Sequence, residues 1–337
     1  MIVKNEENDV AECLKSFIDE VLAVVIVDTG STDRTIEICR EILDASFRRY
    51  EIITYLDAND SMGRICDFSA ARNRCISALE KYGTDYLMMA DADDTLITRG
   101  ISSFIKANPA DFYGVKYNVG SDLSFTSYRI WRNNMGVKYD GRVHECLRID
   151  WKKKVIITGD IEVLHRFTPP VPGMESGTER NMRILRPEIY PSLRSIFYWA
   201  NENVDAGNHD EAVRWYLEYI RRAKDEGAWS AELAHCYFRA ARWCGHLGRV
   251  NEAVALSKEL LESDPSWSEA WCELAYQARR RGDWKQMQRY AERAAQNAFV
   301  PRLFSERDKY TTVPANFILI AKLLSEASNE DRYNHPE

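Results

Sequence analysis

The order of strand and helix patterns along residues 1–94 constrains the fold more than any other feature of this sequence. Apolar runs rich in β-branched residues predict strands, and the segments between them repeat apolar residues every three or four positions, as one face of a helix does. The predicted strands are residues 1–3, 22–27, 51–56 and 86–90. A β-α-β-α-β-α-β order predicts a mostly parallel sheet with helices on both faces. Ligands of such sheets bind at the carboxyl ends of the strands, where Asp28 and Asp91 lie.

The acidic run Asp91-Ala-Asp93-Asp94 follows the last of these strands directly. In an extended backbone, residues two apart point the same way, so Asp91 and Asp93 are predicted to present their carboxylates to one point. Hard oxygen ligands suit Mg²⁺ or Mn²⁺, which keeps open positions for phosphate oxygens. The run therefore predicts a metal site, and an acidic surface turn is the alternative.

Strands and turns replace the helical pattern between residues 112 and 167, and a proline-rich break follows. The predicted strands here are residues 112–117, 125–131, 142–149 and 161–165. Thr168-Pro-Pro-Val-Pro-Gly173 continues neither a helix nor a central strand, because proline lacks the backbone N–H that both require. A domain boundary is expected at this break.

The second half of the chain is helical and repeats. The segment Gly207-Asn-His-Asp-Glu-Ala-Val213 recurs from Gly248 and, more loosely, from Gly282, which is 34 residues further on. This period, with glycine at a turn, resembles tetratricopeptide repeats. We therefore expect three parts: a strand-containing domain at residues 1–168, a linker helix at residues 169–190 and helical repeats at residues 191–330. Aromatic residues between the repeats are predicted to fill the core of the stack: Trp215, Tyr219, Tyr237, Phe238, Trp271 and Tyr276.

Composition limits the class of protein. With 337 residues, 45% apolar and 29% charged, the chain has the make-up of a soluble globular protein of about two domains. The net charge of −7 argues against a general nucleic-acid-coating role. The eight cysteines form no Cys-x-x-Cys pair, so reduced core thiols and a cytoplasmic location are expected. No apolar run approaches the roughly 20 residues that span a bilayer, so no membrane span is expected.

Six blocks of the sequence, in order, resemble family-2 glycosyltransferases of the GT-A fold. These blocks are residues 1–7, 25–35, 67–73, 91–94, 129–133 and 141–145, and the helical stretch 179–185 extends the likeness into the repeats. The resemblance implies an α/β, Rossmann-like GT-A domain that binds a nucleotide-sugar, followed by an all-α tetratricopeptide-like domain. Two departures stand out. Asp94 occupies a position where many relatives carry Glu, and the first strand lacks the residues that usually precede it.

The donor implied by this resemblance is a UDP-sugar held with Mn²⁺ or Mg²⁺. Asp93 is the implied metal ligand, and Asp91 binds either the metal or the donor ribose. Asp28 is placed to accept a hydrogen bond from uracil N3–H, and an Asx turn that caps the next helix is the alternative.

Three further residues are assigned to the donor side. The resemblance favours a donor contact for Arg72, and pairing with an Asp at the edge of the core is the alternative. Lys4 and Glu6 follow the first strand and are expected at the rim of the nucleotide pocket.

On the acceptor side, inverting sugar transfer requires a base that deprotonates the acceptor. His144 and Glu145 lie side by side on a predicted strand, where neighbours point to opposite faces, so only one of them can face the acceptor. Glu145 is the predicted base, and His144 either orients the loop or contacts phosphate. His165, at the end of a predicted strand, is a candidate third metal or diphosphate ligand. A hydrogen-bonded structural role is the alternative for both histidines.

Rival functions and acceptors remain open at this level. The fold could be an inactive transferase whose repeats bind a partner, or a nucleotidyltransferase, although residues 4–8 lack the glycine-rich phosphate loop of the latter class. Tetratricopeptide arrays commonly hold extended peptides, which favours a peptide or protein acceptor, including a Cys or Ser side chain. A glycan is the ordinary alternative for the family. A modified nucleobase is not favoured, and it would contact the basic cluster of Arg148, Trp151 and residues 152–154.

Overall fold

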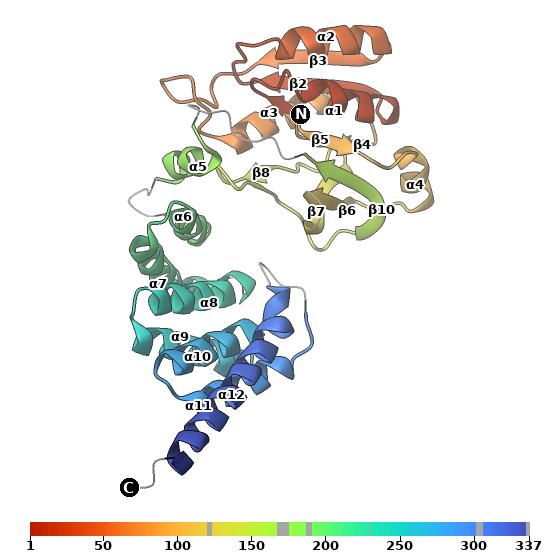
Figure 1. The fold of residues 1–337 in the computed structure, drawn as a ribbon. Helices are drawn as coiled ribbons and strands as arrows, with labels where there is room; N and C mark the ends of the chain where they lie inside the picture. The colour runs from red at the N-terminus through yellow and green to blue at the C-terminus, as the bar shows by residue number, and fades with distance from the viewer. Residues whose placement is uncertain (120–122, 167–174, 187–190, 229, 301–305, 335–337) are drawn as a thin grey trace. The chain divides into compact units, whose positions relative to one another are not determined.

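The computed structural model describes residues 1–119, 123–166, 175–186, 191–228, 230–300 and 306–334 (Figure 1). It divides into two compact units, Met1–Ser176 and Gly177–Glu337. Each unit is described by itself.

The first unit opens with the predicted alternation of strands and helices. A parallel three-stranded sheet has the order β1-β2-β3. Its strands are Ile2–Val3, Ala23–Asp28 and Arg49–Thr54, and the helices between and after them are α1 (Val10–Phe17), α2 (Thr35–Ser46) and α3 (Phe68–Glu80), with a 3₁₀ turn at Ile18–Glu20 after α1. Along β2, Ile26 packs with the side chains of α1 and α2, whereas Val25 and Val27 pack with those of α3. This alternation places helices on both faces, as the sequence predicts.

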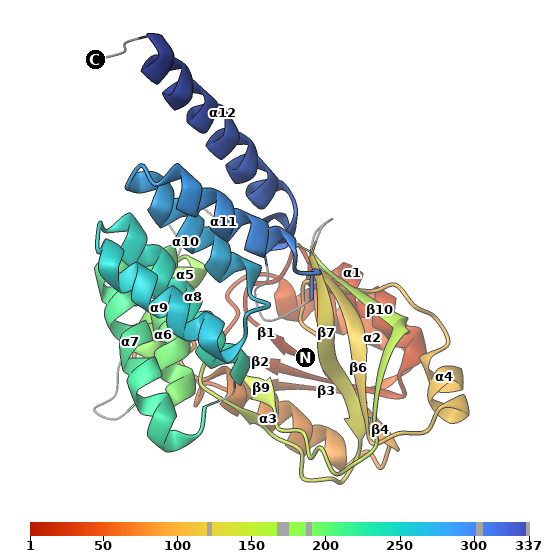
Figure 2. The ribbon, with the colours of Figure 1, turned by 90° about the horizontal axis from the view of Figure 1, so that it is seen from below.

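A second sheet, of five strands, corrects part of that prediction. Its order is β4-β7-β6-β10-β5, and every pairing except the parallel β6–β10 pair is antiparallel. The strands are β4 (Tyr86–Met88), β5 (Asp94–Leu96), β6 (Phe112–Val119), β7 (Leu123–Arg132) and β10 (Val155–His165), and α4 (Ile101–Ala107) follows β5. Figure 2 shows β6, β7 and β10 side by side. The strand that leads to Asp91 was expected in the parallel sheet, but it pairs antiparallel with β7.

The predicted strand at residues 142–149 is wrong. Only Cys146–Leu147 (β9) is a strand there, paired with Tyr139–Asp140 (β8), and residues 141–144 form a bend. Gly141 and His144 have left-handed φ angles of 98° and 51°, which a regular strand excludes. The loop is tied to α3 instead, because the Phe68 N–H donates to the Arg142 carbonyl at 2.8 Å. The argument that His144 and Glu145 face opposite sides of a strand therefore does not apply.

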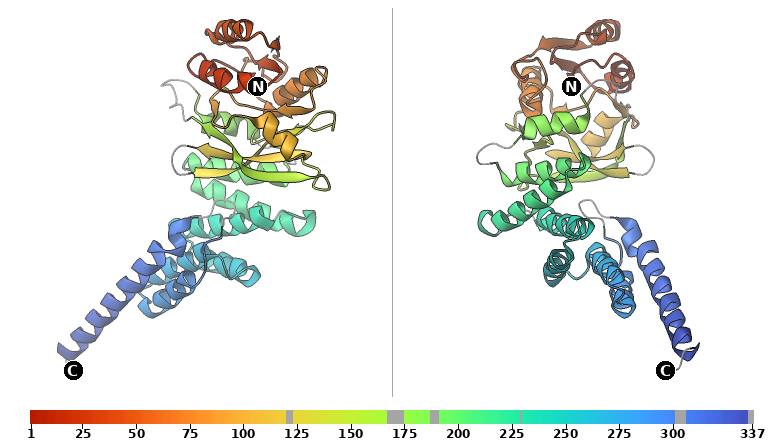
Figure 3. Two further views of the ribbon diagram at one scale, coloured as in Figure 1. Left: turned by 90° about the vertical axis from the view of Figure 1, so that its right-hand side faces the viewer. Right: turned by 60° about the vertical axis from the view of Figure 1, so that its left-hand side comes forward.

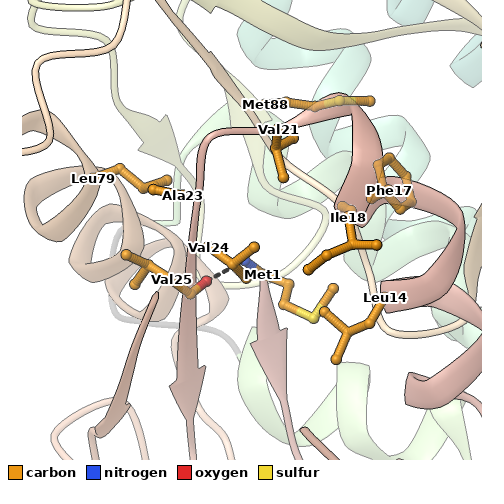
Figure 4. Close-up of a pocket in the computed structure, with 11 residues that line it drawn as sticks. Met1, Leu14, Phe17, Ile18, Val21, Ala23, Val24, Val25, Leu79 and Met88 are labelled. Atoms are coloured by element: carbon orange, nitrogen blue, oxygen red, sulfur yellow. Dashed lines mark hydrogen bonds between the residues drawn. The ribbon is translucent and has the colours of Figure 1, made fainter. Parts of the chain in front are cut away.

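The first strand, β1, is short. β1 spans two residues, and beside its start lies an apolar cavity of about 60 Å³ (Figure 4). The Met1 amino group is buried there and donates to the Val25 carbonyl at 2.9 Å. The cavity is lined by apolar side chains of α1, β2 and β4, among them Leu14, Phe17, Val24 and Met88. It carries no carboxylate, unlike the polar strand ends where Asp28 and Asp91 lie.

The second unit is a stack of helices (Figure 3). α6 and α7, α8 and α9, and α10 and α11 are joined by turns at Gly207, Gly248 and Gly282, whose φ angles of 77°, 81° and 72° favour glycine. The glycine repeat in the sequence thus marks the turn inside each helix pair, as predicted. The helices are α5 (Gly177–Leu185), α6 (Leu193–Asp205), α7 (His209–Glu226), α8 (Ser230–His246), α9 (Val250–Ser263), α10 (Ser268–Arg280), α11 (Trp284–Ala295) and α12 (Thr312–Asn334), with a 3₁₀ turn at Arg307–Tyr310.

The core of the stack contains most of the aromatic residues assigned to it. Tyr219 and Phe238 are buried, and Trp215, Tyr237 and Trp271 are partly buried, whereas Tyr276 is exposed and the prediction is wrong there. All eight cysteines lie in described residues as free thiols, and all except Cys66 and Cys146 are buried. None of the described helices has the length and hydropathy needed to cross a membrane.

Candidate active site

The acidic run forms a turn at the end of β4 and not an extension of the strand. The Asp94 N–H donates to the Asp91 carbonyl at 3.1 Å, and the Asp91 N–H donates to Asp94 Oδ2 at 2.9 Å. Because the backbone turns, Asp91 and Asp93 point to different partners, and the predicted convergence of their carboxylates is wrong. Asp91 faces arginine side chains, and Asp93 faces His165.

Each carboxylate oxygen of Asp91 is paired with an arginine. Oδ1 lies 2.7 Å from Arg72 Nη1, and Oδ2 lies 2.9 Å from Arg129 Nη1. Burial opposes ionisation of Asp91, but the two guanidinium groups outweigh it and hold the pKa of Asp91 well below its usual range. Asp91 is therefore a permanent anion that is already neutralised by protein cations.

Asp93, Asp94 and His165 form the group best suited to a cation. One ligand atom from each lies within 4.8 Å of the others. The antiparallel pairing of β5 and β10 sets His165 opposite Asp94, and His165 Nδ1 lies 3.4 Å from Asp93 Oδ1 and 3.2 Å from Asp94 Oδ1. Hydrogen bonds to these carboxylates raise the pKa of His165 to about 10. A divalent cation would take the place of that proton, since metal ligation requires a neutral imidazole.

Within this group, Asp94 is the most constrained residue. Its side chain is 1% exposed, Oδ1 accepts from Tyr117 OH at 2.6 Å, and Oδ2 accepts from the Asp91 N–H. The Asp93 carboxylate is only half-buried. Asp93 and His165, which the sequence also singled out, are thus better placed to ligate a cation, and Asp94 supports them. Asp91, the other predicted ligand, is not part of the group.

Arg72 connects the acidic turn to the predicted base. Its Nε lies 2.6 Å from Glu145 Oε1, and its Cζ lies over the Tyr139 ring at 5.4 Å from the centroid. Burial opposes the charge on Arg72, but Asp91 and Glu145 outweigh it and raise the pKa of Arg72. The structure therefore brings Glu145 next to Asp91, although these residues are far apart in sequence. His144 lies in the bend beside Glu145, half-buried and with a left-handed backbone.

On the nucleotide side, Asp28 takes part in an Asx turn. Its Oδ1 accepts from the Ser31 N–H at 2.8 Å and from the Gly30 N–H at 3.3 Å, and Asp33 bonds separately to Thr35 at the start of α2. These bonds are the alternative that the sequence left open for Asp28. Its Oδ2 has no hydrogen-bond partner among the described residues, so recognition of uracil by Asp28 stays a prediction that depends on that oxygen.

Lys4 and Glu6 lie in the loop after β1, as predicted. Lys4 Nζ donates to the Gly63 carbonyl, and the Glu6 N–H donates to Thr35 Oγ1 at 2.7 Å. Burial, followed by the charges of Asp93 and three other aspartates, raises the pKa of Glu6 to about 7. Glu6 thus shares an acidic environment with Asp93.

Arg129 and Tyr117 are site residues that sequence reasoning did not assign. Arg129 pairs with Asp91, and its Cζ lies 4.7 Å from the centre of the Tyr117 ring. The available signal was an arginine directly before the apolar pair Ile130-Trp131 in a predicted strand. A charged residue at such a position is expected to have a buried partner.

Comparisons with known proteins find a family match for the first unit. Residues 1–164 match the family described as glycosyl transferase family 2. The SPbeta prophage-derived glycosyltransferase SunS of Bacillus subtilis (strain 168) is 25% identical over 241 residues, which are 66% of this chain and 53% of SunS. The chain therefore spans about half the length of that relative.

The second unit has its own likenesses. A TPR repeat-containing protein of Synechococcus elongatus is 37% identical over 97 residues, which are 29% of this chain and 20% of that protein. The solved structure of MamA from Desulfovibrio magneticus RS-1 is 10% identical, with 44% of this chain and 84% of that chain covered and a TM-score of 0.31, too low to carry an argument. Residues 1–164 of this chain thus match glycosyl transferase family 2, and the chain continues into helical repeats that are similar to a TPR repeat-containing protein.

Proposed function

We propose that this protein is an inverting glycosyltransferase that moves a sugar from a UDP-sugar to an acceptor with the help of Mn²⁺ or Mg²⁺. The observation that carries the proposal is the convergence of Asp93, Asp94 and His165 at a strand end, within a domain of glycosyl transferase family 2. An N/O ligand set with one imidazole suits Mn²⁺ in particular.

Asp93 and His165 are the proposed ligands of the cation, and Asp94 fixes the imidazole that lies 3.2 Å from its Oδ1. When bound, the cation neutralises the charge that develops on the departing diphosphate. Lys4, Glu6 and Asp28 are proposed to line the nucleotide side.

Glu145 is the proposed base. Arg72 holds its Oε1 at 2.6 Å, which fixes the carboxylate in one orientation. Oε2 has no hydrogen-bond partner among the described residues, so it is the atom that would take the acceptor proton. Arg72 is proposed to position the base through this ion pair. Only the guanidinium nitrogens of Arg72 that form no ion pair with Glu145 or Asp91 are proposed to contact the donor.

For the acceptor we propose a peptide or protein side chain, held in part by the repeats, because helical repeat arrays commonly bind extended peptides. A glycan is the second candidate. Two side chains of the basic cluster that would suit a nucleobase are engaged elsewhere. Arg148 pairs with Asp140 at 2.6 Å, and Lys154 Nζ donates to the Pro109 carbonyl at 2.6 Å. These two contacts count against the cluster as a nucleobase site.

The test is hydrolysis of a panel of UDP-, GDP- and ADP-sugars with Mn²⁺ and with EDTA. The expected result is slow hydrolysis of at least one UDP-sugar, lost in EDTA and in Asp93→Asn. Asp44→Asn, at the exposed end of α2, is the matched control and should behave as wild type. Absence of hydrolysis with every donor, together with absence of UDP binding, would favour an inactive transferase fold. Hydrolysis that is indifferent to EDTA would contradict the metal dependence.

A further inference from the structure

Asp91 is held by two largely buried cations that come from different elements of the first unit. Arg72 reaches it from α3 and Arg129 from β7. The side chains of these arginines are only 10% and 12% exposed, so both pairs are shielded from solvent. In such surroundings an ion pair that loses one member leaves an uncompensated charge. The two arginines therefore fix both oxygens of Asp91 firmly.

The position of Arg129 is itself fixed by three contacts besides Asp91. Its carbonyl accepts from the Met89 N–H at 2.9 Å, which joins β7 to the segment just before the acidic turn. Its Nε donates to Ser127 Oγ at 3.0 Å, and its guanidinium lies over the ring of Tyr117. Tyr117 in turn donates to Asp94 Oδ1. Arg129 is thus built into the sheet and is oriented by the same residues that support the cation group.

These contacts form one chain from the proposed base to the acidic turn. Glu145 pairs with Arg72, Arg72 pairs with Asp91, and Asp91 pairs with Arg129. Arg129 Nη1 also lies 3.7 Å from Asp94 Oδ2. If Arg129 released Asp91 Oδ2, the carboxylate would be left with one partner and could turn toward the neighbouring Asp93. Arg72 would then lose the fixed anion that aims its Nε at Glu145.

We propose that Arg129 is a positioning residue that keeps Asp91 away from the cation site and, through Asp91 and Arg72, sets the orientation of Glu145. The part that concerns Glu145 rests on the proposed function. The part that concerns Asp91 and the cation does not, and it can be measured without any sugar donor.

The first experiment titrates the full-length protein with Mn²⁺ alone and follows free Mn²⁺ by electron paramagnetic resonance. Arg129→Gln is expected to bind Mn²⁺ about tenfold more tightly than wild type, because a freed carboxylate adds a charged oxygen ligand. The gain should vanish in Asp91→Asn/Arg129→Gln, which has no carboxylate to release. Arg132→Gln is the matched control, since Arg132 lies on the same strand but forms an exposed pair with Asp111 at 3.2 Å, and it should leave the affinity unchanged.

The second experiment measures steady-state transfer or donor hydrolysis. Arg129→Gln should lower kcat about 10- to 100-fold with little change in the KM for the donor, as expected when an outer contact that orients a reacting group is lost. Arg129→Lys should recover part of kcat, because it restores the charge without the forked geometry.

Unchanged Mn²⁺ affinity in both folded Arg129 variants would overturn the proposal, even if kcat falls, because a merely structural arginine would behave in that way. Should Arg129→Gln fail to fold, Arg129→Lys provides the same comparison, with a smaller gain expected. A wild-type protein that hydrolyses no donor would count against the proposed function, whereas a gain in Mn²⁺ affinity in Arg129→Gln would still support the role of Arg129.

Discussion

Two carboxylates, Asp91 in the first unit and Glu269 in the second, are held in different ways. In the first unit, Asp91, Glu145, Arg72 and Arg129 form ion pairs between full charges, all close to one strand end. In the second unit, the buried carboxylate of Glu269 accepts hydrogen bonds from Tyr310 OH at 2.7 Å and from the Glu306 N–H at 3.1 Å, which are neutral donors. Buried ion pairs add little net stability, so a cluster of them is better explained by a site than by folding. The difference between Asp91 and Glu269 indicates that Asp91 belongs to a site, whereas the neutral bonds of Glu269 serve packing.

Removing a carboxylate should therefore cost more in the first unit than in the second. Asp91→Asn leaves two largely buried arginines without their shared carboxylate. We expect a loss of about 3–5 kcal/mol in the free energy of unfolding. Glu269→Gln keeps an acceptor for its neutral donors, and we expect a loss of about 1–2 kcal/mol. Urea unfolding of both variants, monitored by circular dichroism, measures the difference. Equal losses of unfolding free energy in Asp91→Asn and Glu269→Gln would contradict this expected difference.

Glu145→Gln should lower turnover without weakening donor binding. Gln keeps an oxygen for the Arg72 contact but accepts no proton, so kcat is expected to fall on the order of 10²-fold while UDP affinity stays close to wild type. Steady-state kinetics with calorimetry of UDP binding checks both. Asp140→Asn is the control, because Asp140 forms an exposed pair with Arg148. If Asp140→Asn loses turnover and Glu145→Gln does not, the base is Asp140.

In the second unit, replacing a glycine in one of the left-handed turns should measurably lower the free energy of unfolding. Gly248 has a φ of 81°, and a Cβ at this position would meet no atom within 4 Å, so Gly248→Ala tests backbone strain alone. We expect a loss of about 1–2 kcal/mol and a Tm lower by about 2–8 °C. Gly159→Ala, at a glycine without a left-handed φ and with equally open space, should leave the Tm unchanged. A Gly248→Ala melting curve that overlays that of the wild type would show that the left-handed conformation at this position does not disfavour alanine.

The effect that is smallest at neutral pH concerns His235, which packs against the Phe197 ring. Burial and the charge of Arg239 lower its pKa to about 3. The unfolded chain takes up this proton near pH 6.5, whereas the folded chain does not, so stability is lost as pH falls from about 6.5 to about 3. We expect His235→Gln to remove about 1 kcal/mol per pH unit of this dependence. Urea unfolding of both proteins at pH 6, 5 and 4 gives the slopes, and parallel slopes would contradict the assignment.

Local signals in the sequence predicted much of this molecule. The alternation at residues 1–94 and the glycine spacing from Gly207 to Gly282 depend on contacts between near neighbours, and both are confirmed. Asp93 and His165 were also singled out, because acid or imidazole at a strand end is visible without the fold.

The features that the sequence did not predict depend on contacts between residues that are far apart in the sequence. The partners of Asp91 lie on α3 and β7, and β4 pairs with a strand that is distant in the sequence. The bend at residues 141–144 follows from hydrogen bonds to α3, which override the β-strand pattern. Arginines that pair with a partly buried aspartate have no periodic signature, so Arg129 stayed unassigned.

The most direct test of the account is calorimetry of UDP binding to the wild type and to Asp93→Asn, each with Mn²⁺ and with EDTA. If Asp93 and His165 hold a cation that contacts the diphosphate, EDTA should weaken UDP binding to the wild type by about tenfold or more, which is about 1.4 kcal/mol. Asp93→Asn should bind UDP as weakly with Mn²⁺ as with EDTA. Equal affinity of the wild type in the two conditions would contradict the central claim that this strand end is a metal-dependent donor site.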